Sequence, residues 1–156
     1  MKVLFFMLVT FSGLNAWALQ DLSFQGSLGF DRGAVNIGGD VDYQIKREHT
    51  VGGYFILGTE KDNARNQFWS MGGDVKVFFG PDLWKLYLAP GVGIASFDLA
   101  NGDSEMTFGS IFKIGALIEI NLDMYLGLEL MTYQNWFSDK APAGFEVMNA
   151  TFRIDF

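Results

Sequence analysis

The chain has 156 residues and a formal net charge of −7, from 11 Lys and Arg against 18 Asp and Glu. This acidic balance lacks the clustered Lys and Arg of a nucleic-acid-binding surface, so no nucleic-acid partner is expected. Because the chain has no cysteine, we expect neither disulfide bonds nor a lipid anchor on cysteine. Sixteen Phe, 19 Gly and only three Pro favour many short strands joined by tight turns.

The first 18 residues have the pattern of a secretory signal peptide. Lys2 precedes an apolar run over 3–9, and Ala16-Trp17-Ala18 has the small-x-small form of a cleavage site. The apolar run is shorter than the roughly 20 residues that a membrane-spanning helix needs. We therefore expect residues 1–18 to be removed and residues 19–156 to form a single domain, with Lys2 lost and a net charge of −8.

Most of the remaining chain alternates apolar and polar residues, the two-residue period of a β-strand rather than the spacing of a helix. The alternation is clearest over 22–31 and 35–45 and weakest over 50–59. Pro90 has no backbone N–H, so it predicts a bulge or a missing ladder bond in its strand. The eight predicted strands are 22–31, 35–45, 50–59, 69–79, 86–95, 107–120, 124–133 and a last strand that ends at 156.

The last strand alternates without a break up to a terminal aromatic residue. In a closed barrel the last strand must pair with the first, which explains an ordered strand at the end of the chain. Its apolar row, the expected assembly signature, consists of Met148, Ala150, Phe152, Ile154 and Phe156.

The two faces of the predicted strands differ in composition. One is almost entirely Val, Leu, Ile, Phe and Met, and the other is rich in Gly, Ser, Ala and Tyr with scattered charges. A soluble, lipocalin-like barrel would carry more Lys and Glu on its outer face, but only 19% of this chain is charged. The sequence therefore predicts an all-β fold: an eight-stranded antiparallel up-and-down transmembrane β-barrel with small and polar side chains inside.

Several charged residues fall on the predicted interior face. In so narrow a space they must pair, hydrate or be neutralised. We expect a structural network of salt bridges, with a path for protons or small ions as the alternative. A general diffusion pore is not expected, since eight strands leave little continuous channel. The expected lumen network contains Asp40, Asp42, Asp74, Lys76, Lys113, Glu119, Glu129 and Arg153, with Asp155 on the same face.

No catalytic or metal-binding pattern stands out. His49 is the only histidine, and it lies in a predicted turn beside Thr50 without a serine within two residues. The loop residues Asp98, Asn101, Asp103 and Glu105 offer oxygen atoms to calcium but lack EF-hand spacing, so a solvated loop is expected. We predict no enzyme activity, no metal and no cofactor. Adhesion or another recognition role of the loops stays open.

Together, the signal peptide, the alternating strands, the short turns and the terminal Phe156 resemble those of small Gram-negative outer-membrane β-barrel proteins. This broad group includes OmpX-like barrels and the transmembrane domain of OmpA-like proteins. The resemblance covers residues 19–156 and is architectural, so it assigns no subfamily. It implies an outer-membrane location in contact with lipid and lipopolysaccharide, and insertion by the β-barrel assembly machinery, which would recognise the last strand. We expect a monomer.

In such proteins both termini face the periplasm. The resemblance therefore implies that connections 31–34, 60–67, 98–106 and 134–144 face outside the cell, and that turns 46–50, 80–84 and 121–123 face the periplasm. Aromatic residues near strand ends are predicted to form two interfacial girdles. One girdle would contain Phe30, Trp69, Phe97, Phe108, Tyr133, Trp136 and Phe145, and the other Tyr43, Phe79, Trp84 and Phe156.

The expected function is a structural or surface-exposed role in the outer membrane, with a narrow and largely plugged lumen. The alternatives are a narrow channel for small solutes or ions, a lipid-modifying enzyme, and a loop-mediated adhesin. The lipid-modifying reading is weakened because the His-x-Ser signature of lipid A deacylases is missing around His49.

Overall fold

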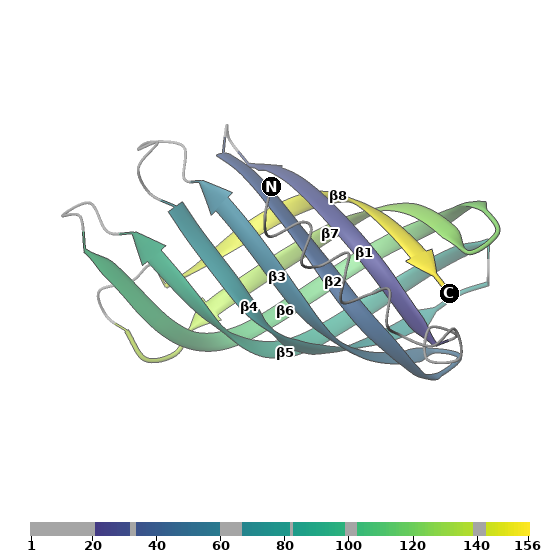
Figure 1. Ribbon diagram of the computed structural model, residues 1–156, viewed down its shortest axis with the longest axis horizontal. Helices are drawn as coiled ribbons and strands as arrows, with labels where there is room; N and C mark the ends of the chain where they lie inside the picture. Colours follow the sequence, from purple (N-terminus) through teal and green to yellow (C-terminus); the bar gives the residue numbers. More distant parts are fainter. Residues whose placement is uncertain (1–20, 32–33, 60–66, 82, 99–102, 139–142) are drawn as a thin grey trace, which may run out of the picture.

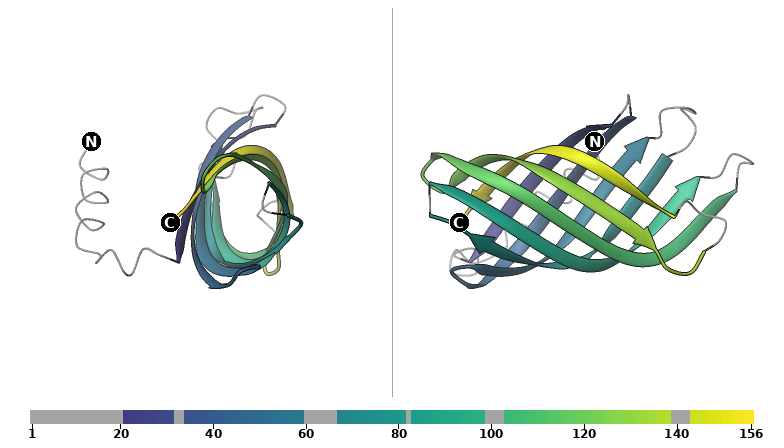
Figure 2. Two further views of the ribbon diagram at one scale, coloured as in Figure 1. Left: turned by 90° about the vertical axis from the view of Figure 1, so that its right-hand side faces the viewer. Right: turned by 180° about the vertical axis from the view of Figure 1, so that it is seen from behind.

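The chain folds into a closed barrel of eight antiparallel strands in chain order, as predicted. The computed structural model describes residues 21–31, 34–59, 67–81, 83–98, 103–138 and 143–156. Figure 1 shows the tilted strands along the barrel, and the end-on view of Figure 2 shows the closed ring. The strands are β1 (Leu22–Asp31), β2 (Ala34–Lys46), β3 (His49–Thr59), β4 (Gln67–Phe79), β5 (Trp84–Asp98), β6 (Ser104–Asn121), β7 (Met124–Asn135) and β8 (Gly144–Asp155).

The first and last strands close the barrel. β1 pairs with β8 from Ser23 opposite Asp155 to Gly29 opposite Asn149. Beyond the end of β8, the backbone N–H of Phe156 donates a hydrogen bond to the Leu22 carbonyl over 2.9 Å. The Phe156 ring meets the Phe24 ring edge-on, with 5.7 Å between centroids. The backbone hydrogen bonds of β1 and β8 are therefore satisfied within the barrel, which removes both open edges.

The connections lie at two opposite ends of the barrel, which we call the loop end and the turn end. Strands β1, β3, β5 and β7 finish at the loop end, and β2, β4, β6 and β8 finish at the turn end (Figure 1). Several predicted loops are too long, since β6 begins at Ser104, which pairs with Asp98 at the end of β5. The predicted signal peptide, 1–18, and the loop segments 32–33, 60–66, 99–102 and 139–142 lie outside the described residues.

Two turn-end connections need unusual backbone angles. Gly80, in the Gly-Pro-Asp sequence, has φ of +105°, which a residue without Cβ adopts readily. Asp123 has φ of +60°, a left-handed conformation that Asp tolerates better than most residues. Both turns were predicted from their residue types.

Pro90 interrupts one ladder, in agreement with its missing N–H. The β4–β5 pairing stops after Asp74 opposite Gly91 and resumes at Val77 opposite Leu88. The register is the same on both sides of the gap, so the strand has a break in pairing and no bulge. On its other side Pro90 pairs with Phe112 of β6.

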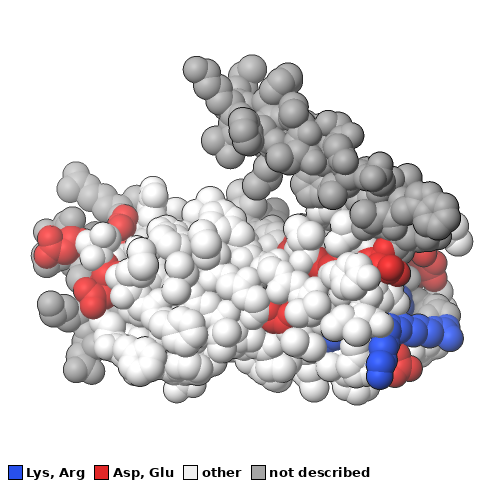
Figure 3. Space-filling view, turned by 60° about the horizontal axis from the view of Figure 1, so that its bottom comes forward, with Lys and Arg blue, Asp and Glu red and all other residues white. Residues whose placement is uncertain are grey.

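The outward face of the strands is a continuous apolar belt. Examples on opposite sides of the ring are Ile37, Ile114 and Leu128, whose exposed fractions are 61%, 47% and 61%. The space-filling view of Figure 3 shows a mostly uncharged surface between charged ends. Among the described residues, no helix is long and apolar enough to cross a membrane.

The inward face divides along the barrel axis. A central ionic network is flanked by apolar and aromatic side chains toward each end. The turn-end cluster contains Phe78, Tyr87, Ala89, Leu117 and Tyr125. The loop-end side chains form two adjoining clusters that share Phe68 and Phe145; their buried members are Tyr54, Ile56, Ala95, Phe97, Ile111, Met131, Tyr133 and Val147.

Candidate functional site

Strand alternation positions the charged interior. Asp40 and Asp42 lie two residues apart on β2, and Asp74 and Lys76 lie two residues apart on β4, so each pair points to the same face. The register then places Asp42 opposite Gly52, and Gly52 opposite Asp74. Gly52 leaves room here, because a Cβ at this position would overlap the Asp42 carboxylate. Side chains from nonadjacent strands therefore meet inside the barrel.

Two buried lysines bridge three aspartates. Lys76 Nζ lies 2.7 Å from Asp42 Oδ2 and 3.5 Å from Asp40 Oδ2. Lys113 Nζ contacts Asp40 Oδ1 and lies 2.8 Å from Asp74 Oδ2. The two lysine side chains are at most 2% exposed. Such charges are tolerated away from water only when they are paired, and here each lysine contacts two carboxylates.

Arg153 extends this network toward the turn end. Its Nη1 donates to Asp42 Oδ2 over 2.7 Å, its Nε donates to Asp155 Oδ1 over 2.6 Å, and its Nη2 donates to Ser23 Oγ over 2.5 Å. The guanidinium also lies over the Phe78 ring, 4.9 Å from its centroid. The three nitrogen atoms of the guanidinium are thus all used.

Glu129 is held in a different way, by neutral donors. Tyr87 OH donates to its Oε2 over 2.6 Å, Gln25 Nε2 donates to the same oxygen over 3.2 Å, and Asn149 Nδ2 donates to Oε1 over 3.1 Å. Gln25 Nε2 also donates to Tyr87 OH over 3.1 Å. Gln25, Tyr87 and Asn149 are network members that charge alone does not predict, although their positions in the alternation place all three on the inward face.

The remaining two predicted members lie toward the turn end. Asp155 has a side chain that is 25% exposed, and it lies 3.8 Å from Lys85 Nζ as well as contacting Arg153. Glu119 is only partly buried near the end of β6 and is not in the ion pairs that join the central residues. Glu119 keeps the inward parity that the sequence predicts, and its membership of the network stays a prediction.

The aromatic prediction is wrong for three residues. Phe97, Tyr133 and Phe145 were assigned to an outer girdle, but Phe97 is 6% exposed, Tyr133 is 1% exposed, and Phe145 packs against both inside the barrel. Each lies at an inward position, so parity along the strand, rather than nearness to its end, decides the direction. The side chain of Phe30 lies outside the described residues. Trp69 is partly buried, whereas Phe108, Trp136, Tyr43, Phe79, Trp84 and Phe156 are exposed.

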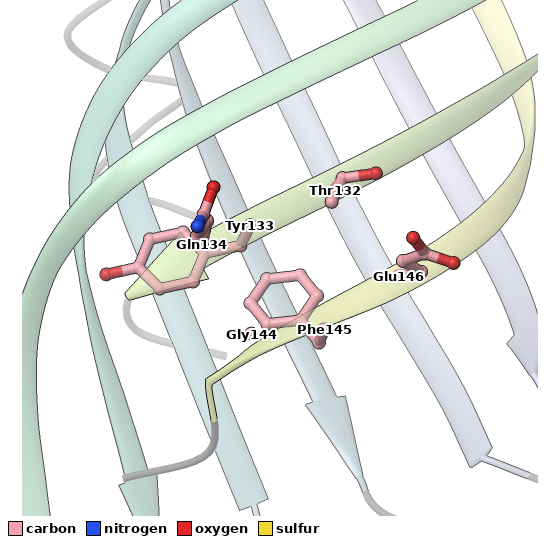
Figure 4. Close-up of a pocket in the computed structure, with 6 residues that line it drawn as sticks. All are labelled: Thr132, Tyr133, Gln134, Gly144, Phe145 and Glu146. Carbon is pink, nitrogen blue, oxygen red and sulfur yellow. The ribbon is translucent and has the colours of Figure 1, made fainter. Parts of the chain in front are cut away.

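The inward rings pack together near the loop end. Tyr133 and Phe145 are stacked with 5.3 Å between centroids and 10° between planes, as Figure 4 shows. Phe145 also lies 4.6 Å from Phe68 and 6.2 Å from Phe97, measured between centroids. A cavity of about 290 Å³ adjoins this stack and is lined by Thr132, Tyr133, Gln134, Gly144, Phe145 and Glu146.

The other candidate sites in the sequence are His49 and the possible calcium ligands of the loop after β5. His49 is exposed at the start of β3, whereas the adjacent Thr50 is buried on the inward face. Glu105 accepts a hydrogen bond from Ser138 Oγ over 2.8 Å, while Asn101, another of the possible calcium ligands, lies outside the described residues. In the part of the chain that the structure describes, no group of three or more His, Cys, Asp and Glu side chains could hold a metal ion.

The fold defines the class: the chain has the architecture of small eight-stranded outer-membrane β-barrels. It is similar to the N-terminal β-barrel domain of Pseudomonas aeruginosa OprF, with a TM-score of 0.70, 11% identity, and coverage of 88% of this chain and 98% of that one. It is also similar to Neisserial surface protein A (TM-score 0.66, 14% identity, 86% and 94% coverage). The outer-membrane enzyme PagL gives a TM-score of 0.54 at 17% identity, with 86% and 99% coverage.

These likenesses show the fold alone. A de novo designed transmembrane β-barrel is similar to the same degree as PagL, with a TM-score of 0.54 and 15% identity over 88% of this chain and 96% of that one. The sequence matches no protein-family model and no curated protein. The fold is therefore shared by proteins with very different roles, and function must be argued from the residues of this chain.

Proposed function

We propose that this protein is an integral outer-membrane β-barrel with a structural or surface-exposed role and without catalytic activity. The observation that carries the proposal is the outward apolar belt, which continues over all eight strands. Each strand has at least 10 residues, enough for a tilted strand to cross the hydrocarbon core. The complete ring leaves no open edge, as a lipid environment requires. Lipid and lipopolysaccharide would be the partners of this belt.

The proposal includes an interior closed to solutes. The ionic network fills the centre with Lys76, Lys113 and Arg153, each at most 3% exposed. Toward the loop end, stacked Tyr133 and Phe145 add an apolar layer. A solute would have to displace paired charges and then rings, and eight-stranded barrels are narrow enough for side chains to fill.

The proposal also includes insertion by the β-barrel assembly machinery through the last strand. The apolar row of β8 faces outward, with Met148, Phe152 and Phe156 exposed by 61%, 36% and 55%. β8 turns alternate side chains toward lipid and closes the ring by pairing with β1. This arrangement supports a role of β8 in the last step of folding. The signal peptide predicted over 1–18 would supply export to the periplasm.

Cell fractionation together with a gel-shift assay tests this proposal. We expect the protein to sediment with outer membranes and to resist extraction by alkaline carbonate. Unheated samples should migrate faster in detergent gels than boiled samples, because the closed barrel stays compact until heat opens it. Recovery as a soluble periplasmic protein, with the same mobility before and after boiling, would exclude a membrane barrel.

A further inference from the structure

The outward face of β7 and β8 carries a group of polar residues near the loop end, which we call the polar notch. Within it Thr132 pairs directly with Glu146, and Gln134 pairs directly with Gly144. All four occupy outward positions, and the next outward residue of β8 is the apolar Met148, which is 61% exposed. The polar notch therefore interrupts the apolar composition of the outer surface.

Glu146 is unusual for its position. Among the outward positions of the described strands, the other carboxylate is Asp98, at the last residue of β5. Glu146 is the third residue of β8, and its carboxylate makes no hydrogen bond or ion pair with the described residues. The same is true of the side chains of Thr132 and Gln134. Charged groups beside lipid are costly without a partner, so this glutamate indicates a site for a partner outside the chain.

The cavity of about 290 Å³ lies on the outer side of this part of the wall. Its six lining residues come from β7 and β8 alone, as Figure 4 shows, whereas a cavity in the lumen would also meet strands from across the ring. Four of the six are the outward residues of the polar notch. Gly144 has no side chain, so it leaves open the space between Gln134 and Glu146. The unpartnered polar groups and the cavity are therefore one feature.

Exposed aromatic rings place the polar notch at the level of lipid headgroups. On its loop-end side lie Phe108, Trp136 and Phe137, which are 38%, 48% and 79% exposed. The Trp136 indole N–H donates to Ser110 Oγ over 3.3 Å, and Ser110 is the β6 partner of Gln134. Such aromatic residues gather where a membrane meets water. A lipid with its headgroup in the notch would therefore lay its acyl chains along the apolar belt.

The side chains of the polar notch select among headgroups by hydrogen bonding. The Thr132 hydroxyl and the Gln134 amide can each donate and accept, and the exposed Glu146 carboxylate accepts. A phosphate only accepts and would be repelled by the carboxylate. An ammonium only donates and would leave the Gln134 NH₂ group without a partner. Sugar hydroxyls both donate and accept, so they can satisfy all three side chains together.

We propose that the polar notch binds the sugar headgroup of a glycolipid, with hydroxyl groups on Glu146, Gln134 and Thr132. The inference rests on the proposed function, because it requires the apolar belt to lie in a lipid bilayer. It adds to that function a defined site on β7 and β8 and the chemical class of the lipid that occupies it.

Native mass spectrometry of the refolded barrel with bound lipid tests the proposal. The probes are glucosyl diacylglycerol, phosphatidylethanolamine and phosphatidylglycerol with identical acyl chains, offered in equal amounts. We expect the glucosyl lipid to be retained about fivefold more than the other two, the factor that one net hydrogen bond supplies. Equal retention of the three lipids would overturn the proposal. Preference for the ammonium or the phosphate headgroup would overturn the choice of sugar.

Matched variants locate the bound lipid. Glu146→Ala removes the carboxylate and Thr132→Phe fills the cavity, so each should abolish the preference for the glucosyl lipid. Asp98→Ala removes the other outward carboxylate, away from the polar notch, and should keep the preference. Persistence of the preference in both notch variants, or its loss in Asp98→Ala, would contradict the site.

Two controls separate this proposal from the proposed function and from a soluble ligand. A barrel that gives the fast-migrating band on unheated gels but shows no headgroup preference would overturn the site alone, whereas absence of that band would overturn the membrane barrel. Free glucose should not displace the glucosyl lipid. Displacement at matched concentration would assign the polar notch to a soluble sugar and overturn the glycolipid.

Discussion

Single residues in the interior act through partners that are far away in the sequence. Arg153 of β8 donates to Asp42 of β2 across a separation of 111 residues, and both are almost completely buried. A buried ion pair is weak evidence of net stabilisation, because desolvation offsets most of its Coulomb energy. Removing one partner is different, since the other charge is left buried and alone. The consequence is that truncation of these residues should be costly.

Arg153→Ala should lower the free energy of unfolding by about 3–5 kcal/mol at most, because Asp42 would keep Lys76 as its one cationic partner among the described residues. Denaturant unfolding in micelles, followed by tryptophan fluorescence, measures the loss. Lys46→Ala, at the exposed last residue of β2, is the control and should change stability by no more than about 0.5 kcal/mol. Equal stabilities of the two variants would mean that the interior is hydrated enough to screen Asp42.

The face of each residue could be predicted from the sequence, whereas its partner could not. Alternation places Asp42 and Arg153 on the inward side, because side-chain direction follows parity along a strand. That Tyr87, Gln25 and Asn149 meet at Glu129 depends on the register of four strands, which local patterns do not determine. Tyr133 and Phe145 lie near strand ends, which predicts an outward girdle, but parity along the strand turns both side chains inward.

At the scale of strands, glycines determine how closely neighbouring elements pack. Gly72 of β4 faces inward and pairs with Gly93 of β5. A Cβ at Gly72 would overlap the Val92 carbonyl and lie 2.6 Å from the Gly93 α-carbon. The next residue, Gly73, faces outward, and a Cβ there would have its nearest neighbour at 3.4 Å. Gly72 is therefore required for the close packing of β4 and β5, whereas the position of Gly73 has room for a Cβ.

Gly72→Ala should destabilise the barrel by about 1–3 kcal/mol, since backbone atoms must move to admit the methyl group. Gly73→Ala is the matched control and should be neutral or raise stability by about 0.5–1 kcal/mol through lower chain entropy in the unfolded state. The gel-shift midpoint on heating compares both variants with the natural chain. A Gly73→Ala variant as unstable as Gly72→Ala would contradict the inward and outward assignments.

Strand existence followed from alternation, but strand length did not. β5 extends to Asp98, beyond the predicted 86–95, and β6 begins at Ser104, before the predicted 107–120. Backbone pairing continues there although the apolar pattern has already faded. Pro90 was a correct indicator of a local defect. Pro90 interrupts the β4–β5 ladder and leaves the β5–β6 ladder intact, because each strand of the barrel pairs with a different neighbour on each side.

For the whole molecule, layers of paired charges and stacked rings should block passage along the axis. Purified protein in a planar bilayer should therefore show no regular conductance steps. The same protein preparation must give the fast-migrating band on unheated gels, which verifies that the barrel is folded. Uniform steps at a constant voltage would instead support the narrow ion channel and contradict a closed interior.

If the apolar belt lies in lipid, labels placed on it must be shielded from water, and the lack of cysteine in the chain allows single labelled cysteines to test this directly. Single cysteines at Ile114 and Leu128, in the middle of the belt, and at Leu122, in the β6–β7 turn, can each carry a fluorescent label. We predict that brominated acyl chains quench the labels at 114 and 128, and that aqueous iodide quenches the label at 122. Iodide quenching at 114 and 128 as strong as at 122 would contradict a transmembrane barrel.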